Sequence, residues 1–320
     1  MLTGARTRME HRPIQLWVLH DHKPGHTSQL HGLVDRLNAI AAVEVRWVDA
    51  TQIRFYWQDW LRKRWPEQGF THAPDIVTGA GSASHRLILL ARRVFGCMAS
   101  VIMRPSIPLS LYDAAIVPRH DRPSERDNIL ITRGVMNTLK PREAGADAPE
   151  HTMLIGGESK HFVWSSEQTL DQIQQVLEAE PSQQWTITNS RRTPEEFGVA
   201  LSQKRWPQVN FCPHTETPKG WVANQLTRSA QVWVTPDSVS MVYEAITSGA
   251  ATGLFSLPPT QHGRIHEGLD QIRALKLYTP FEDWQQTHQL ALPSEPLWEA
   301  DRSARWLLER YDAWKREHHL

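Results

Sequence analysis

Short apolar runs alternate with longer stretches of helical periodicity along the whole chain. In the first half, the runs predict strands at 15–21, 43–49, 75–81, 100–105, 114–118 and 129–132, with helices at 27–40 and 84–95. In the second half, the same reasoning predicts strands at 152–155, 184–188, 209–212, 230–234 and 252–256. Helices are predicted there at 166–179, 194–204, 219–228, 238–248 and 264–275, with a last helix near 295–317.

The predicted strands are continuous runs rich in Val, Ile and Leu, which is typical of parallel strands covered by helices on both faces. A polar segment rich in Pro, Gly and Ala, 141–150, separates two such sets. We therefore predict an α/β protein with two Rossmann-type doubly wound domains, 13–145 and 150–290, that face each other across a cleft. The helix within 291–320 is expected to pack back on the first domain. Ligands of such proteins bind at the carboxyl ends of strands, so the residues that follow each strand are the candidates.

The composition narrows the class of protein. Lys+Arg and Asp+Glu number 35 each, so a net charge of zero gives no support to a nucleic-acid binder. Cys97 and Cys212 lie within or beside apolar runs and are expected to be free thiols in a reducing compartment. The chain shows no signal peptide and no apolar run long enough to span a membrane. We expect a cytoplasmic protein without a bound metal, because the 16 histidines show no paired ligand spacing.

The segment 231–249, QVWVTPDSVSMVYEAITSG, predicts an anion site in the second domain. An apolar strand runs into a Thr-Pro-Asp-Ser turn and then into a helix, whose first-turn N–H groups can bind a phosphate. Asp237 or Ser238 is expected to cap this helix. Glu244, about two turns further on, is placed to accept hydrogen bonds from a ribose. The alternative interpretation is a well-capped Rossmann-type helix without a ligand.

A glycine-rich turn follows the first strand of the second domain, in the segment 154–164, LIGGESKHFVW. Gly156 and Gly157 come directly after the strand, with Ser159 and Lys160 next. Exposed N–H groups in such a turn are candidates to cradle a diphosphate. The pattern GxxxxGK[ST] is absent, so the turn does not support an ATPase.

The segment 190–194, SRRTP, predicts the start of a helix with Thr193 as its N-cap and Pro194 as its first residue. Arginines at a helix start oppose the preference of the helix dipole for acidic residues there. An anion held by Arg191 and Arg192, beside Ser190, would resolve this local conflict. A solvated pair of arginines is the alternative.

The turn after the first strand of the chain, HDHKPGHTSQLHGL at 20–33, carries candidate acid-base chemistry. Asp21 and His26 are residue types that can take a proton from an acceptor hydroxyl. Gly25 permits a tight turn or a close backbone approach, and Gln29 lies in the helix that follows. The alternative is a polar turn in which Asp21 only pairs with Lys23.

Three other strand ends of the first domain give secondary candidates. The segment 78–85, TGAGSASH, offers Gly79 and Gly81 before a helix, but it lacks the third glycine of GxGxxG, so a dinucleotide dehydrogenase is poorly supported. Arg104 is a candidate to bind a phosphate or carboxylate, or to form an interdomain salt bridge. His120 and Asp121 are a candidate acid-base pair, although adjacent residues of an extended chain point to opposite faces.

Aromatic and basic residues are interleaved in the segment 54–70, RFYWQDWLRKRWPEQGF. This combination in a short amphipathic stretch is typical of a surface that binds a membrane interface. It lies in the first domain, where the acceptor-binding half is expected. The alternative is a helix that packs within the domain, with arginine stems lying along apolar surface.

Five motifs taken in order resemble the mitochondrial-fission ELM-type family: the Gly-His turn after the first strand, PRHD, LIGGESK, SRRTP and VTPDSVSMVYEA. The resemblance covers about residues 14–275, and SRRTP and DSVSM are its most specific parts. It implies a fold of the GT-B glycosyltransferase-like superfamily, with a nucleotide-sugar site in the cleft. Arg104-Pro105 reverses an order frequent in the family, which puts a role for Arg104 in doubt. The matching residues are Gly25, Gln29, His120, Asp121, Gly156, Gly157, Ser190, Arg191, Arg192, Thr193, Asp237, Ser238, Ser240, Met241 and Glu244.

These observations together predict a metal-independent GT-B-type glycosyltransferase that uses a nucleotide sugar as its donor and needs no cofactor. Ser238, Ser240 and the helix N-terminus are expected to hold the diphosphate, with an arginine of SRRTP neutralising the leaving group. Asp21 or His26 is expected to be the general base. The expected acceptor is lipid-linked, such as a lipopolysaccharide or another envelope glycolipid precursor, reached at the inner face of the cytoplasmic membrane through 54–70.

Two other functions fit the same fold. An epimerase or hydrolase of nucleotide sugars would turn over the donor without an acceptor and would need no membrane contact. A non-catalytic binding protein would keep its partner after loss of Asp21 and His26. The sequence leaves both alternatives open.

Overall fold

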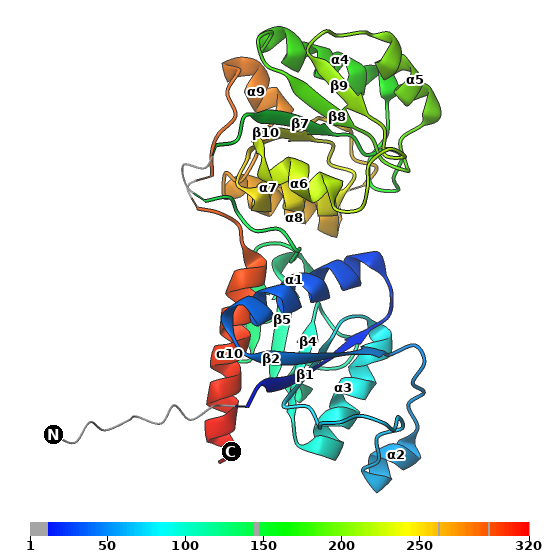
Figure 1. Cartoon of the computed structure of the whole chain (residues 1–320), viewed down its shortest axis with the longest axis vertical. Coiled ribbons are helices and arrows are strands. Elements are labelled where there is room, and N and C mark those ends of the chain that lie inside the picture. The colour runs from blue at the N-terminus through cyan, green and yellow to red at the C-terminus, as the bar shows by residue number, and fades with distance from the viewer. Residues whose placement is uncertain (1–11, 144–146, 262, 294, 320) are drawn as a thin grey trace, which may run out of the picture. The chain divides into compact units, whose positions relative to one another are not determined.

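The computed structural model describes residues 12–143, 147–261, 263–293 and 295–319, and these form two compact units (Figure 1). The first unit contains the described residues up to Val117, together with Pro123–Leu130 and the C-terminal residues from Ala300. The second unit contains Pro118–Arg122 and Ile131–Glu299. The segment 141–150, predicted as the boundary, falls inside the second unit by this division.

The first unit is built on a six-stranded sheet in the order β2-β1-β3-β4-β5-β6. β1 pairs in parallel with both β2 and β3, which places the first strand of the chain in the interior of the sheet. Trp17 of β1 is buried and contacts the rings of Trp65, Phe70 and Phe95 edge to face. The strands are β1 (Ile14–His20), β2 (Val43–Asp49), β3 (Ile76–Gly79), β4 (Met98–Ile102), β5 (Ala114–Pro118) and β6 (Ile129–Thr132).

Helices α1 and α3 follow β1 and β3 and pack against this sheet. The C-terminal helix α10 belongs to the same unit, because Asp301 accepts a hydrogen bond from Arg36 of α1 and Arg310 donates to the carbonyl of Asp113. The helices here are α1 (Pro24–Ile40), α2 (Trp57–Arg62), α3 (Ser82–Phe95), η1 (Leu109–Leu111) and α10 (Glu299–Glu317); the short η2 (Arg119–Asp121) groups with the second unit.

The second unit repeats this plan with the strand order β12-β11-β10-β7-β8-β9, and its strands pair in parallel. Its strands are β7 (Glu150–Leu154), β8 (Trp185–Thr188), β9 (Val209–Cys212), β10 (Ser229–Val234), β11 (Ala251–Leu254) and β12 (Thr279–Pro280). Its helices are α4 (Ser166–Ala179), α5 (Glu195–Gln203), α6 (Trp221–Thr227), α7 (Val239–Ser248), α8 (Arg264–Ala274) and α9 (Phe281–Thr287).

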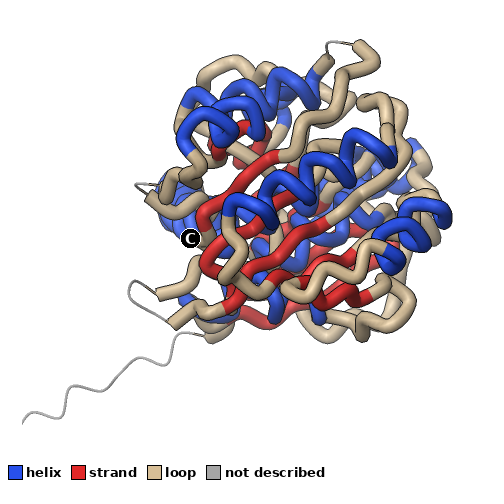
Figure 2. The backbone as a smooth tube through the Cα atoms, turned by 90° about the horizontal axis from the view of Figure 1, so that it is seen from above, coloured by secondary structure: helices blue, strands red, loops and turns tan. Residues whose placement is uncertain are grey.

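Both faces of this second sheet are buried, and consecutive residues of one strand enter opposite cores. Met153 packs on the face covered by α4, α5 and α9, whereas Leu154 packs on the face covered by α6, α7 and α8 (Figure 1). Figure 2 shows strands running between helices in the same way. The prediction of parallel, doubly wound α/β domains from continuous apolar runs is therefore confirmed.

The elements that the sequence did not predict are short: α2, α9, the 3-10 turns and the two-residue strand β12. Several helices also begin a few residues from the expected position. α1 begins at Pro24 and α3 at Ser82, both earlier than predicted, whereas α5 begins at Glu195. Within the described residues, no helix combines the length and the apolar character that crossing a membrane requires.

Candidate nucleotide and acid-base sites

The glycine turn after β7 is packed against the carboxyl ends of β8 and β10. The N–H of Gly156 donates to Thr235 Oγ1 at 2.7 Å, and the N–H of Gly157 donates to Asp237 Oδ2 at 3.0 Å. A Cβ atom on Gly156 would lie 2.1 Å from Asp237 Oδ2, and one on Gly157 would lie 2.1 Å from the carbonyl oxygen of Arg192. Glycine is therefore required at both positions, because neighbouring atoms leave no room for a side chain. The two N–H groups predicted to cradle a diphosphate are already bonded within the protein.

Asp237 is the centre of this arrangement. Its side chain is fully buried, and Oδ2 accepts a hydrogen bond from Arg192 Nη2 at 2.6 Å. Its other oxygen, Oδ1, is buried and has no hydrogen-bond partner among the described residues. The expected capping role is wrong: Ser238 occupies the N-cap position of α7, yet no side chain caps the helix, because Asp237 turns toward Gly157 and Arg192. The first-turn N–H groups of α7 consequently remain without a capping side chain.

The SRRTP turn also differs from the prediction in its details. Thr193 is not the N-cap; its hydroxyl donates to the carbonyl of Gly156 and accepts from the N–H of Ser190 at 2.8 Å. The N-cap of α5 is Pro194, and Glu195 stands with a second glutamate in the first turn. The helix dipole is therefore satisfied by acids, and the conflict inferred from the sequence does not exist.

The two arginines of this turn have different environments. Arg192 is neutralised by Asp237 and also donates to the carbonyl of Glu158 at 2.9 Å. Arg191 is exposed and has no carboxylate partner in the described part of the chain. Of the pair, only Arg191 carries a positive charge that is available to an anion. Ser190, which donates to the carbonyl of Gly156 at 3.0 Å, holds the turn in place.

The remaining candidates of the second unit lie along α7 and in the loop after β7. Burial raises the pKa of Glu244 to about 7, and this carboxyl has no partner among the described residues. Ser240 is exposed, whereas Met241 packs against the buried cluster of α6, α7 and α8. Ser159 Oγ accepts hydrogen bonds from the N–H groups of His161 and Phe162, both at 3.2 Å, and so closes its own loop.

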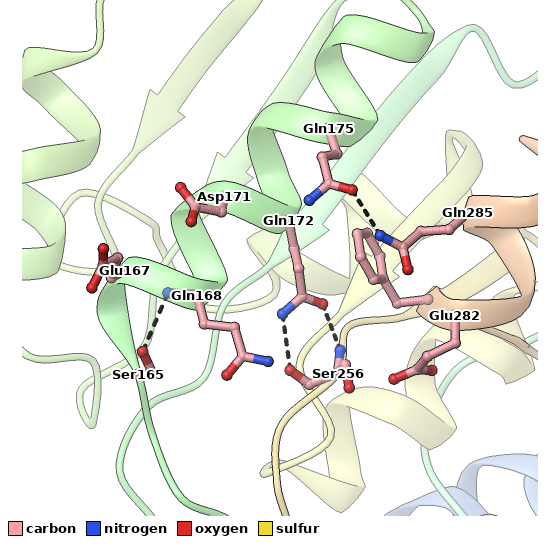
Figure 3. Close-up of a pocket in the computed structure, with 10 residues that line it drawn as sticks. Ser165, Glu167, Gln168, Asp171, Gln172, Gln175, Ser256, Glu282 and Gln285 are labelled. Atoms are coloured by element: carbon pink, nitrogen blue, oxygen red, sulfur yellow. Dashed lines mark hydrogen bonds between the residues drawn. The ribbon is translucent and has the colours of Figure 1, made fainter.

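Two cavities of the second unit differ in chemistry. One, of about 760 Å³, shares Thr193 with the SRRTP turn and is lined by groups such as Asn189, Val199, Phe211 and His214. The other, of about 410 Å³, is lined by three carboxylates and several amides (Figure 3). There Gln172 bonds both the N–H and the carbonyl of Ser256, at 2.7 and 2.9 Å, so the buried amide is already satisfied. The acidic lining disfavours a phosphate in the second cavity.

In the first unit, Asp21 and His26 form a pair at the carboxyl end of β1. His26 Nδ1 lies 2.9 and 3.0 Å from the two carboxylate oxygens, and Lys23 Nζ lies 3.6 Å from Oδ2. Burial raises the pKa of Asp21, but the hydrogen bonds from His26 and from the Lys23 N–H outweigh it and hold this pKa below its usual value. The ionised carboxylate therefore fixes the proton of His26 on Nδ1. Nε2 has no partner among the described residues and can accept a proton.

Gly81 packs closely against this pair. Its φ is +88°, and a Cβ atom there would lie 2.2 Å from Asp21 Oδ2 and 2.7 Å from His26 Nδ1. Gly25, in contrast, lies inside α1, and a Cβ atom on it would meet nothing within 4 Å. Gly25 therefore makes neither the tight turn nor the close backbone approach that the sequence permitted there. Gln29 is buried in α1 and donates to the carbonyl of Gly25 at 3.4 Å.

Gly81 is the secondary candidate that joins the Asp21–His26 pair. His120 and Asp121 form the 3-10 turn η2, which belongs to the second unit and packs against α8. Arg122, the next residue, pairs with Glu267 of α8. Arg104 is exposed in the loop after β4. Among the described residues, no group of His, Cys, Asp and Glu side chains is arranged to hold a metal ion.

Sequence reasoning missed two residues that complete these sites. Thr235 anchors the glycine turn, and its place within the Thr-Pro-Asp-Ser turn was the available signal. His85 is 6% exposed and interacts electrostatically with the Asp21–His26 pair. Nothing in the sequence near His85 indicated that proximity, because it arises from the pairing of β1 with β3.

A family model described as "Mitochondrial fission ELM1" matches residues 24–311. No curated protein sequence matches the chain significantly. Among solved structures, a putative UDP-N-acetylglucosamine 2-epimerase from Listeria monocytogenes is similar with a TM-score of 0.57 and 11% identity, over 94% of this chain and 97% of that one. MurG from Acinetobacter baumannii is similar with a TM-score of 0.51 and 12% identity, over 94% and 99%. The UDP-GlcNAc 2-epimerase from Methanocaldococcus jannaschii gives a TM-score of 0.53 and 11% identity, over 92% and 100%. These proteins have the GT-B fold, and the chain shares it.

Proposed function

The chain belongs to the mitochondrial fission ELM1 family, and from this premise and the two sites above we propose that it is a glycosyltransferase with a nucleotide-sugar donor. The observation that carries the proposal is the Asp21–His26 pair. An imidazole oriented through Nδ1 by an ionised carboxylate, with Nε2 left open, is the arrangement of a general base. A protein that only binds a partner has no need of it.

The second unit is proposed to hold the donor. The uncapped N-terminus of α7 and the unpaired Arg191 supply positive potential for a diphosphate. Arg192 does not contribute, because its charge is neutralised by Asp237. Glu244 is proposed to accept the ribose hydroxyls. Uridine diphosphate sugars are the first donors to test, because a structure of the same fold is named for such a substrate.

The proposed reaction uses one proton transfer and one substitution. His26 Nε2 takes the proton of an acceptor hydroxyl, and the hydroxyl oxygen forms a bond to the anomeric carbon of the sugar. The bond from that carbon to the diphosphate breaks, and the nucleoside diphosphate leaves with the electron pair. Arg191 and the N–H groups of α7 stabilise the charge that develops on it, which requires no metal ion.

A lipid-linked envelope acceptor remains part of the proposal. Tyr56, Trp57 and Leu61 are 49%, 69% and 74% exposed, so much of the aromatic-basic segment is not consumed by packing within the unit. Exposed aromatic residues beside arginines and lysines are suited to the interface of an anionic membrane. We propose that this surface brings the protein to the inner face of the cytoplasmic membrane.

Thermal unfolding with a panel of nucleoside diphosphates and nucleotide sugars, with and without EDTA, tests the donor assignment. A ligand at 100 times its Kd should stabilise the protein by about 2.7 kcal/mol. The stabilisation should survive EDTA and be lost in Arg191→Ala but kept in Lys219→Ala, a control at an exposed lysine of the same unit. No stabilisation by any member of the panel would overturn the donor site. Consumption of the donor without an acceptor would favour an epimerase or hydrolase.

A further inference from the structure

A cavity of about 830 Å³ lies entirely within the first unit and was not predicted from the sequence. Its walls come from the segment after β2, the first turns of α3 and the loop after β4. Its charged, aromatic and hydrogen-bonding side chains are those of Arg54, Phe55, Ser82, His85, Arg86 and Ser106. The cavity therefore combines positive charge, hydroxyl groups and an aromatic wall.

The positive charge of this cavity is uncompensated. Arg54 and Arg86 are exposed, and among the described residues their guanidinium groups meet only aromatic rings, at 5.2 Å from Tyr56 and 6.0 Å from Phe55. Asp49, which precedes Arg54 by five positions, is already engaged by other groups. Asp49 pairs with His22 at 2.8 Å and accepts from the N–H of Thr51 at 2.9 Å. An anionic ligand is the partner that these two arginines lack.

The start of α3 adds to this positive potential. The helix has 14 residues, and its N-cap is Gly81, which has no side chain to cap the first turn. Ser84 does not replace it, because its hydroxyl donates to the carbonyl of Gly81 at 2.8 Å. The first N–H groups of α3 therefore have no capping side chain, and two residues of that turn, Ser82 and Ala83, line the cavity.

His85 lines the cavity with an imidazole whose tautomer is set by a hydrogen bond from Ser106. It is 6% exposed, and its Nδ1 accepts a hydrogen bond from the N–H of Ser106 at 3.4 Å. The remaining proton of the neutral ring is therefore on Nε2. Burial lowers the pKa of His85, so the ring stays neutral and acts as a donor at physiological pH.

Apolar surface continues from the cavity along the chain. Phe55 lines the cavity, and the residues that follow it, Tyr56, Trp57 and Leu61, are largely exposed. A phosphate site that continues into exposed aromatic and aliphatic side chains matches the two ends of a lipid, since neither a free sugar phosphate nor a nucleotide has an aliphatic part to cover Leu61.

We propose that this cavity binds the phosphate of an anionic lipid, with Arg54, Arg86 and the first turn of α3 around the phosphate and the hydrocarbon on Tyr56, Trp57 and Leu61. Gly81 links this site to the general base, because this N-cap residue of α3 also packs closely against Asp21 and His26. Under the proposed transferase function, on which this part rests, the lipid is the acceptor, anchored by its phosphate at the helix whose start abuts the base. Binding of the lipid itself does not depend on that function.

Binding of dihexanoyl phosphatidic acid to the full-length protein tests the proposal, with glycerol 3-phosphate and dihexanoylglycerol as the two halves of the probe. The double variant R54Q/R86Q should bind the phosphatidic acid at least about tenfold more weakly, since it loses two charge-assisted contacts. The variant R126Q/R316Q removes the same charge from exposed arginines of the same unit that lie outside both the cavity and the segment 54–70, and it should bind like the native protein. The variant W57A/L61A should lose affinity for the lipid and keep it for glycerol 3-phosphate.

Equal losses in R54Q/R86Q and R126Q/R316Q would show general attraction to charge and would overturn the site. Preference for glycerol 3-phosphate over the lipid would overturn the lipid as its occupant. If the native protein binds neither the lipid nor glycerol 3-phosphate, and neither compound changes its thermal unfolding, both the site and its lipid occupant would be overturned. Nucleotide-sugar binding, measured separately with Arg191→Ala, reports on the proposed function, so either proposal can fail while the other stands.

Discussion

Gly81 and Asp21 approach so closely that a Cβ atom on the glycine would lie 2.2 Å from the carboxylate oxygen Oδ2. The glycine also has a φ of +88°, which side chains rarely tolerate. A glycine is therefore needed beside this carboxylate, which also forms a hydrogen bond with His26 Nδ1. The part-buried acid-base pair thus lies between the backbone after β3 and the side chains that follow β1.

Gly81→Ala should lower the free energy of unfolding by at least about 1 kcal/mol, because the new Cβ meets both strain and a carboxylate. Gly25→Ala is the matched control, since its Cβ would meet nothing within 4 Å and alanine is favoured over glycine in a helix. Urea-induced unfolding of both variants measures the difference. Equal stability of the two variants would contradict the close approach.

His26→Ala and Asp21→Asn should each slow transfer by about 10²–10⁴-fold, because one removes the base and the other removes the charge that orients it. Donor binding, measured by titration with the nucleotide sugar, should be unchanged in both. His120→Ala is the control, because that residue packs beside α8 in the other unit. Native turnover in His26→Ala would show that Asp21 and His26 do not act as the general base.

Replacing the two arginines of SRRTP should have opposite consequences. Arg192→Ala leaves the buried carboxylate of Asp237 without its partner, and we expect a loss of about 2–3 kcal/mol in stability, less than for a fully buried pair because Arg192 is 41% exposed. Arg191→Ala should change stability by less than about 0.5 kcal/mol and weaken diphosphate binding. Denaturant unfolding and nucleotide titration of both variants separate these effects. A stable Arg192→Ala protein would contradict the structural role of the ion pair.

Glu244 should make stability depend on pH. Its folded pKa of about 7 lies above the ordinary 4.5, so the folded protein binds more protons between these values and stability falls as pH rises through this window. Below pH 4.5 the carboxyl is protonated in both states and the penalty vanishes. Glu244→Gln should therefore be more stable than the native protein at pH 8, by about 3 kcal/mol at most, and equal to it at pH 4. Identical pH profiles of the two proteins would show that the carboxyl is not desolvated.

The same titration should appear in donor binding if Glu244 accepts the ribose hydroxyls as a carboxylate. Affinity for a nucleotide sugar should fall or rise only with Glu244, because its diphosphate has no terminal phosphate that ionises in this range. The affinity should rise as pH increases through about 7, where Glu244 ionises, and should stay flat in Glu244→Gln. Calorimetric titration at several pH values measures it. A rise that persists in the variant would assign the titration to another group.

The sequence predicted the architecture well because continuous apolar runs report burial on both faces of a parallel sheet. Met153 and Leu154 illustrate this, since they enter opposite cores of one unit. Short elements escaped prediction because a six-residue helix such as α2 offers less than two full turns of periodicity. Helix starts also shifted by a few residues, which is the usual uncertainty of helix ends.

For the candidate sites, the sequence predicted which residues take part but not which of them contact one another. Asp21 and His26 are five positions apart in one turn, so the sequence offered both as candidates, but it did not predict the hydrogen bond between them. Asp237 and Arg192 are 45 positions apart, and nothing in either segment indicated that one would neutralise the other. Long-range partners of this kind depend on the order of strands in the sheet, which local patterns do not contain.

Release of nucleoside diphosphate from a uridine diphosphate sugar, with and without an extract of envelope lipids, tests the central claim most directly. The proposed function predicts release that depends on the lipid, survives EDTA and disappears in His26→Ala while the donor still binds. Release that is as fast without lipid would contradict transfer and indicate a hydrolase. Unchanged donor in both mixtures, with the donor shown to bind, would contradict the proposed activity with these substrates.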